Sequence, residues 1–264
     1  MVRILRALPP SARAAAAAGA AYAAFAIVWA APASLSPARA IPDLGDPLHL
    51  AWVMAWDAHQ LVRHPLSLFD ANTFYPYPRS LAFGDHLLPE ALLGAPVFWL
   101  TGNAVLSSNL VVLLALTLSA TAIFILMRDV THSSAVAFLA GLAYAFNTFT
   151  RSEILRVQVL NIEWWPFVFL FLERLARTGR ARYAWLLGGS LLLQGLSGAY
   201  YLVYSALLAP VWLLVAYLGA RRRPSVAELA GLGAALLAAG LVALPVLWPY
   251  AVQLRTMGFE KPLK

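Results

Sequence analysis

The chain has 264 residues, of which 61% are hydrophobic and only 12% are charged. This composition excludes a soluble globular protein of this length, because too few polar side chains remain to cover its surface. The net charge of +7 does not indicate nucleic-acid binding, since the basic residues form short clusters between apolar runs, as in the cytoplasmic loops of membrane proteins. The absence of cysteine excludes disulfide bonds and thiolate metal sites.

The first uncharged run, residues 14–38, is long enough to cross a hydrocarbon core of roughly 30 Å. Arginines at positions 3, 6 and 13 precede it, which predicts a cytoplasmic N-terminus. A cleaved signal peptide is the alternative interpretation, because residues 36–40 read SPARA, which ends in a small-x-small cleavage pattern. The run is longer than the apolar core of a usual signal peptide, about 7 to 15 residues. We therefore expect a membrane span.

Further uncharged runs cover residues 104–127, 133–150, 164–172, 183–197, 199–220 and 229–252. The run at 164–172 is short, and it spans only if its helix begins near Val157. With the N-terminus inside, the basic clusters at residues 128–133, 173–182 and 221–225 all face the cytoplasm, and 9 of the 12 acidic residues face outward. The sequence thus predicts an all-α, polytopic transmembrane helix bundle of about seven spans, forming a single domain over residues 1–264. Chemistry that uses carboxylates is expected on the outer side.

The first outer segment, residues 39–103, is too long for a passive loop and too apolar to be disordered. Its first part, Pro47–Val62, reads as a helix that opens with proline and stops before Pro65. One face of this helix carries His49, Trp52, Trp56 and His59, and we expect it to lie along the headgroup layer. A second helix, at about 89–100, is too short to span and is predicted to be interfacial or re-entrant.

Several short motifs follow one another in a recognisable order. They are Gly45-Asp46, HPLSLFDANTFYPYPRSLAFGDHLL at 64–88, APVFWLTGN at 95–103, AGLAYAF at 140–146, Trp164-Trp165-Pro166 and LQGLSGAYY at 193–201. This order resembles the polytopic membrane glycosyltransferases of the GT-C type, in particular their large bacterial branch. The resemblance implies a multi-spanning helical enzyme of the bacterial cytoplasmic membrane. Such an enzyme moves a sugar from a polyprenyl-phosphate carrier to a glycan, lipid or protein acceptor on the outer side.

The resemblance also implies that an acidic residue in the first outer loop, here Asp46, is the usual catalytic candidate. Because members of the family usually have more spans and often a soluble C-terminal part, we expect this chain to be an N-terminal portion of such an enzyme.

The chemistry of glycosyl transfer points to further site residues. A base must take the proton of the acceptor hydroxyl, for which Asp46 and Asp85 are the catalytic candidates. The departing phosphate needs cations or hydrogen-bond donors, and the substrate-binding candidates are His49, His86, Arg151, Arg156 and Gln158. No cofactor is firmly predicted; a divalent cation held by Asp46 and Asp85 is consistent with the pattern, and the metal ligands stay open.

Structural interpretations compete with these assignments. Asp46 and Asp85 also suit helix capping, the outer aromatic residues suit an interfacial belt, and the two arginines suit lipid headgroups. A transporter or flippase is the main alternative function, but none of the seven runs has a charged residue near its centre, where coupled transporters usually carry one. A non-catalytic membrane subunit is the third possible function.

Overall fold

The structure is a computed structural model, and it describes residues 9–154 and 156–257. Throughout these residues the regular structure is helical, with no β-strand, so the predicted all-α class is confirmed. The helices are α2 (Pro10–Trp29), η1 (Ala33–Leu35), α3 (Asp46–Arg63), η2 (Pro65–Ser67), η3 (Ser80–Phe83), α4 (Leu88–Thr101), α5 (Ala104–Thr131), α6 (Ser134–Ala145), α7 (Thr148–Ser152), α8 (Val157–Leu160), α9 (Trp165–Thr178), α10 (Ala181–Ser197), α11 (Ala199–Gly219) and α12 (Val226–Met257).

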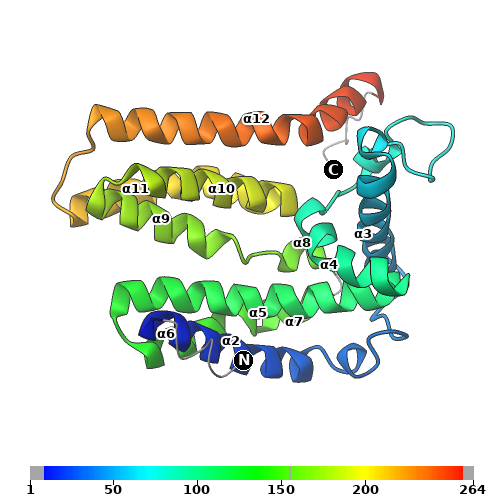
Figure 1. The fold of residues 1–264 in the computed structure, drawn as a ribbon, viewed down its shortest axis with the longest axis horizontal. Helices are drawn as coiled ribbons and strands as arrows, with labels where there is room; N and C mark the ends of the chain where they lie inside the picture. The colour runs from blue at the N-terminus through cyan, green and yellow to red at the C-terminus, as the bar shows by residue number, and fades with distance from the viewer. Residues whose placement is uncertain (1–8, 155, 258–264) are drawn as a thin grey trace, which may run out of the picture.

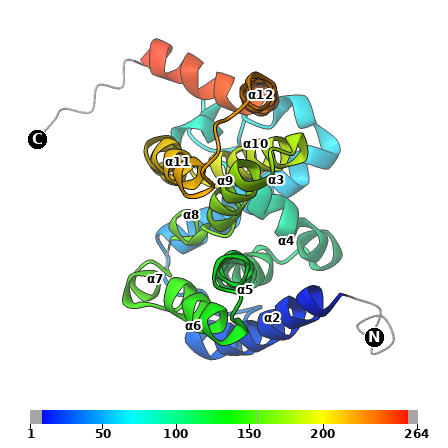
Figure 2. The ribbon, with the colours of Figure 1, turned by 90° about the vertical axis from the view of Figure 1, so that its left-hand side faces the viewer.

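Helix α5 is the central element of the bundle. It packs against α2 and α6 on one side, against α9 on another, and against α3 and α4 near its beginning. Helix α10 then joins α9 to α12, and α11 packs on α9. Figure 2 shows the helices nearly end on, with α12 at one edge and α2 and α6 at the other. The bundle is thus a row of roughly parallel helices in which α5 and α9 occupy the middle.

Four helices in the described part of the chain are long and apolar enough to cross a membrane: α2, α5, residues 200–219 of α11 and residues 226–256 of α12. Many large apolar side chains on α11 and α12 are exposed, among them Leu207, Leu214, Leu237 and Leu241. Apolar side chains on an outer helix face are expected where lipid replaces water. These four helices support a multi-pass membrane protein.

The other predicted spans form shorter helices. Helices α6, α9 and α10 have 12, 14 and 17 residues. The condition set for the run at 164–172, a helix that begins near Val157, is not met, because Val157 belongs to the separate one-turn helix α8 and α9 begins only at Trp165. Pro166 sits in the first turn of α9, where a missing N–H costs nothing. Asn147 likewise divides the run at 133–150, since it forms a capping box with Thr150 at the start of α7.

The predicted outer helix Pro47–Val62 corresponds to α3, and the predicted helix at 89–100 corresponds to α4. Figure 1 shows α3 lying across one end of the bundle, nearly perpendicular to α5 and α12. The predicted face of α3 is also present: His49 stacks on Trp52 and Trp52 on Trp56, with ring centroids 5.7 and 6.2 Å apart, and His59 lies tilted against Trp56 at 6.3 Å. The indole of Trp99 donates to the carbonyl of Ala58 at 2.9 Å and so ties α4 to α3.

Charged residues at the two ends of the bundle follow the predicted asymmetry. At the end where α5 and α9 finish, Asp129 accepts from Arg174 at 2.8 Å and from Arg177 at 2.6 Å. Nearby, Arg222 pairs with Glu228 at the start of α12. This arginine-rich end agrees with a cytoplasmic location. Helix α3 lies at the opposite end, where the candidate site residues are.

Candidate functional site

Asp46 is the first residue of α3, and its side chain is 57% exposed. The first intrahelical bond runs from the amide of His49 to the carbonyl of Gly45 at 3.1 Å, and no side chain caps this helix. Pro47, the second residue, needs no hydrogen-bond acceptor for its nitrogen, so it favours a helix start here. The Asp46 carboxylate is therefore not engaged as a helix cap and is free to take part in other contacts.

Arg156 brings the second outer segment to this carboxylate. Its Nε donates to Oδ2 of Asp46 at 3.3 Å, and its Nη1 donates to Oε2 of Glu153 at 2.9 Å. Glu153 first and Asp46 second raise the pKa of Arg156, so the guanidinium stays charged. The Arg156 side chain is 53% exposed. An exposed charged pair contributes little to stability because water screens it, and both partners remain accessible to a ligand.

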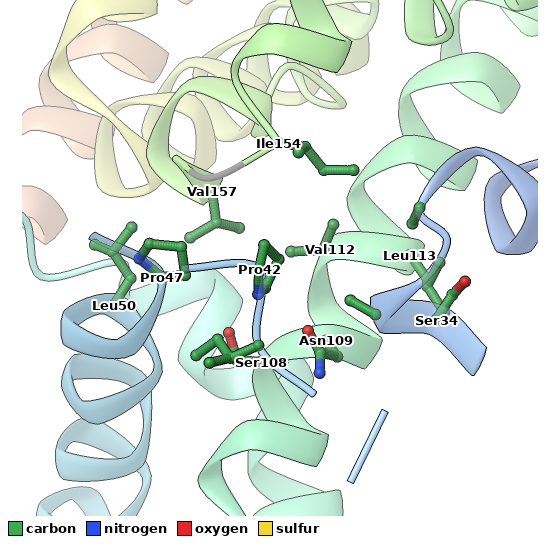
Figure 3. A pocket seen from close by; sticks show the side chains of 13 residues that line it. Ser34, Pro42, Pro47, Leu50, Ser108, Asn109, Val112, Leu113, Ile154 and Val157 are labelled. Atoms are coloured by element: carbon green, nitrogen blue, oxygen red, sulfur yellow. The ribbon is translucent and has the colours of Figure 1, made fainter. Parts of the chain in front are cut away.

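An apolar recess lies next to this pair. Figure 3 shows it between the start of α3, the first half of α5 and the segment around Ile154, with Pro42, Pro47 and Val157 facing it. The enclosed volume is about 30 Å³. A wider hollow of about 370 Å³ shares Pro42 and Ile154 with the recess and is lined further by Arg151, Ser152 and the end of α2. A charged pair and an apolar hollow thus adjoin at the same end of the bundle.

Arg151 lines the hollow, but its guanidinium is already engaged. It donates to the carbonyl of Trp29, and at 3.5 Å to the carbonyl of Ala31. These contacts hold the segment after α2 against α7. Arg151 and Arg156 each use two donors, but those of Arg151 go to backbone carbonyls and those of Arg156 go to the carboxylates of Asp46 and Glu153.

Asp85 and His49 face a separate pocket. Its volume is about 70 Å³, and it is also lined by Trp52, Thr73 and Phe74. Burial raises the pKa of Asp85, and the nearby His49 opposes that rise. A carboxyl group with a raised pKa is suited to accept a proton near neutral pH. His49 lies about one turn after Asp46 on α3, so Asp85 faces a pocket close to the start of the same helix.

His86 is buried rather than open to a substrate. The hydroxyl of Tyr250 donates to the carbonyl of Gly84 at 2.8 Å, so it must accept from Nδ1 of His86, 3.0 Å away. His86 Nε2 is then an acceptor, and it is buried without a partner. Burial lowers the pKa of His86 to about 4, so the ring is neutral. His86 joins the outer loop to α12.

Gln158 lies on α8, and its side-chain oxygen is buried without a hydrogen-bond partner. Its backbone carbonyl faces the link between α10 and α11, where a Cβ on Gly198 would lie only 3.0 Å away. No direct contact joins Gln158 to the Asp46 pair. Among the described residues, no group of three or more histidine, aspartate or glutamate side chains is placed to hold a metal ion.

Three acidic residues stand out that the sequence analysis counted only as outer charges. Asp57, Glu90 and Glu163 have relative exposures of 0%, 0% and 1%. All six of their carboxyl oxygens are buried without a hydrogen-bond partner. One signal was available in advance: Asp57 follows Leu50 and Met54 at helical spacing, on the buried face of α3. Glu90 and Glu163 lie in short apolar stretches that show no comparable periodicity.

Comparison with known proteins adds no identification. No protein-family profile matches the chain, and no curated protein or solved structure is significantly similar to it.

Proposed function

We propose that the chain is a membrane glycosyltransferase of the GT-C type, which transfers a sugar from a polyprenyl-phosphate donor to an acceptor on the outer face of a bacterial cytoplasmic membrane. The observation that carries this proposal is the contact between Asp46 and Arg156, 3.3 Å apart. Through it, a carboxylate and a guanidinium from two separate segments, which we propose to lie on the outer side, meet next to the apolar recess. The order of the sequence motifs supports the same function.

In the proposed reaction, Asp46 accepts the proton of the acceptor hydroxyl while the acceptor oxygen bonds to the anomeric carbon of the sugar. The bond between that carbon and the phosphate oxygen breaks, and the phosphate leaves with the electron pair. Arg156 stabilises the growing negative charge, as arginine binds phosphate through a planar fork of donors. Asp46 and Glu153 occupy its Nε and Nη1 groups in this structure. We infer that phosphate binding displaces one of these carboxylates and leaves Asp46 free to act as base.

The finer architecture is part of the proposal. Seven spans require α6, α9 and α10 to cross with the help of the irregular segments at their ends. Helix α10 has 17 residues, which amounts to roughly 26 Å of helix and nearly matches a hydrocarbon core of about 30 Å. We place the N-terminus in the cytoplasm, and α3 and α4 with the Asp46 pair on the outer side. The lipid donor then approaches from the bilayer, with its phosphate at the height of Arg156.

The test compares Asp46→Asn with the neighbouring control Asp43→Asn, in the full-length enzyme. Asp43 is exposed and only bonds the amide of Gly45. Membranes carrying each protein receive a panel of labelled polyprenyl-phosphate sugars, and transfer is measured with thermal stability. We expect Asp46→Asn to lower transfer by about 10² or more, the usual loss for a general base, with unchanged stability and an active control. Near wild-type transfer by Asp46→Asn would reject this assignment and make Asp85 the next candidate.

Transport remains the second candidate function, because one observation favours it. Buried acidic residues are typical of proton-coupled transporters, and Asp57, Glu90 and Glu163 are buried and unpaired. They lie outside the four long apolar helices, however, whereas coupled transporters usually bind near the middle of the membrane. We therefore favour glycosyl transfer over transport. Substrate-driven proton uptake into proteoliposomes would favour transport instead.

A further inference from the structure

Asp57, Glu90 and Glu163 belong to one buried region of the structure, separate from Asp46. They come from α3, from α4 and from the linker between α8 and α9, which meet at the outer end of the bundle (Figure 1). Glu90 is the central member, since its charge acts on both Asp57 and Glu163. The hydroxyl of Ser197, at the end of α10, lies beside Glu90 and favours its charged form.

Two neutral side chains complete this region. Asn161 and Gln194 are both fully buried, and the side-chain nitrogen of Gln194 donates to the backbone carbonyl of Asn161 at 2.7 Å. The side-chain oxygen of Gln194 and both polar side-chain atoms of Asn161 have no partner. Buried polar atoms in folded proteins are almost always hydrogen-bonded, so these atoms indicate a missing partner.

The kind of missing partner follows from counting donors and acceptors. Unpartnered acceptors in this region are the six carboxyl oxygens and the side-chain oxygens of Asn161 and Gln194. Unpartnered donors are the side-chain nitrogen of Asn161, the indole nitrogens of Trp164 and Trp165, and the hydroxyl of Ser197, which can also accept. Acceptors clearly outnumber donors, and water, which brings as many acceptors as donors, does not correct the imbalance. The missing partner must therefore supply hydrogen-bond donors or positive charge.

Apart from the Ser197 hydroxyl, the surrounding side chains supply neither. None of the ion pairs formed by the described residues includes Asp57, Glu90 or Glu163. The tyrosines nearby donate to backbone carbonyls: Tyr144 to Ile162, Tyr201 to Val159 and Tyr250 to Gly84. His86, which packs on Tyr250, is neutral, and Asp85 on the same loop adds a further acidic group. A metal ion is not favoured, because no group of three such side chains in the described chain has suitable geometry.

We propose that Asp57, Glu90 and Glu163 form a proton-binding site, in which protons on the carboxyl groups supply the donors that the protein lacks. A protonated carboxyl group donates to a neighbouring carboxylate or to the oxygens of Asn161 and Gln194, so a few protons satisfy several acceptors. Protons on these groups also remove the cost of burying several negative charges in one place.

The electrostatic environment agrees with this geometry. Burial first, and Glu90 second, raises the pKa of Asp57 to about 8. Burial raises the pKa of both Glu90 and Glu163, and Glu90 adds to the rise at Glu163. The folded protein then holds protons that the unfolded chain releases near pH 4, so the site destabilises the fold as pH rises from about 4 towards 8. His86 has the opposite effect on stability, because burial lowers its pKa in the folded protein. Its contribution makes the fold more stable as pH rises, but only below about pH 6.5.

The experiment measures thermal unfolding of the detergent-solubilised protein between about pH 6.5 and 9, where His86 has no effect. Glu163→Gln and Glu90→Gln keep the size of the side chain and imitate its protonated form. The matched control is Asp70→Asn, an exposed carboxylate that accepts from the amide of Arg79. We expect the melting temperature of the wild type and the control to fall as pH rises, and those of the two glutamine variants to fall less.

Infrared spectroscopy of the wild type provides a second readout that does not depend on the variants. Protonated carboxyl groups give a C=O band that shifts in D₂O, and this band should persist at pH 7 and weaken in Glu163→Gln. No such band, together with equal pH slopes in all four proteins, would overturn the proposal. Stabilisation by Na⁺, Mg²⁺ or Ca²⁺ that vanishes in Glu90→Gln would also overturn it and identify a cation site. Neither measurement uses sugar transfer, so failure here leaves the Asp46 proposal untouched.

Discussion

Asp46 and Arg156 lie 110 residues apart in the chain and share one hydrogen bond. Each residue has a simple local reason for its position: Asp46 opens a helix beside Pro47, and Arg156 precedes the short helix α8. Their meeting depends on α5, which packs against both α3 and α8. The candidate site is therefore a product of helix packing around α5.

Arg156 is expected to act on the lipid-phosphate donor rather than on stability. We predict that Arg156→Gln lowers kcat/KM for the donor by roughly 10- to 100-fold, the loss expected from one hydrogen bond to a charged group. Arg156→Lys keeps the positive charge but loses the planar fork of donors, so its kcat/KM should lie between those of the wild type and Arg156→Gln. Transfer rates measured against donor concentration check this order. An Arg156→Gln enzyme with unchanged donor kinetics would remove Arg156 from the site.

Tyr250 is predicted to be a stabilising residue. Tyr250→Phe leaves the carbonyl of Gly84 and Nδ1 of His86 without their hydrogen-bond partner. The expected cost is about 1 to 3 kcal/mol in the free energy of unfolding, because the buried Nδ1 of His86 loses its only partner. Tyr200→Phe is the control, since Tyr200 is 58% exposed. Equal melting temperatures for the two variants would contradict the prediction.

At the scale of elements, the apolar runs become helices, and their ends are set by local chemistry. Asn103 caps α5 by accepting from the amide of Leu106 at 2.8 Å, and Gly102 takes the left-handed conformation that closes α4. Gly198 separates α10 from α11, between the predicted runs 183–197 and 199–220. The apolar run at 133–150 breaks because Asn147 starts α7 inside it, and the run at 164–172 joins α9, which begins at Trp165 with Pro166 in its first turn.

The contact between α10 and α12 offers a matched pair of glycines. A Cβ on Gly188 would lie 2.9 Å from the carbonyl oxygen of Ala235 on α12, whereas a Cβ on Gly189 would meet nothing within 4 Å. We predict that Gly188→Ala costs about 1 to 3 kcal/mol in unfolding free energy, because backbone must move. Gly189→Ala should be neutral or slightly stabilising, since alanine favours helix. Equal loss in both variants would argue against close packing of α10 on α12.

At the scale of the whole molecule, topology is the main prediction. The chain has no cysteine, so single cysteines report without further changes. Ser67, after α3, and Thr178, at the end of α9, are both exposed and lie at opposite ends of the bundle. We expect cysteine at 67 to react with an impermeant reagent added to intact cells, and cysteine at 178 to react only after the membrane is opened. Labelling of both from one side would exclude the proposed orientation.

Local composition and helical period were enough to predict the helical class, the four long apolar helices, the arginine-rich end and the two short helices α3 and α4. The shared face of His49, Trp52, Trp56 and His59 on α3 was predictable for the same reason. Only the tertiary structure decided that Asp46 meets Arg156, that His86 is buried against Tyr250, and that Asp57, Glu90 and Glu163 share one interior region. Burial of an acidic residue depends on which helices pack over it, and no local pattern around Glu90 or Glu163 encodes those distant contacts.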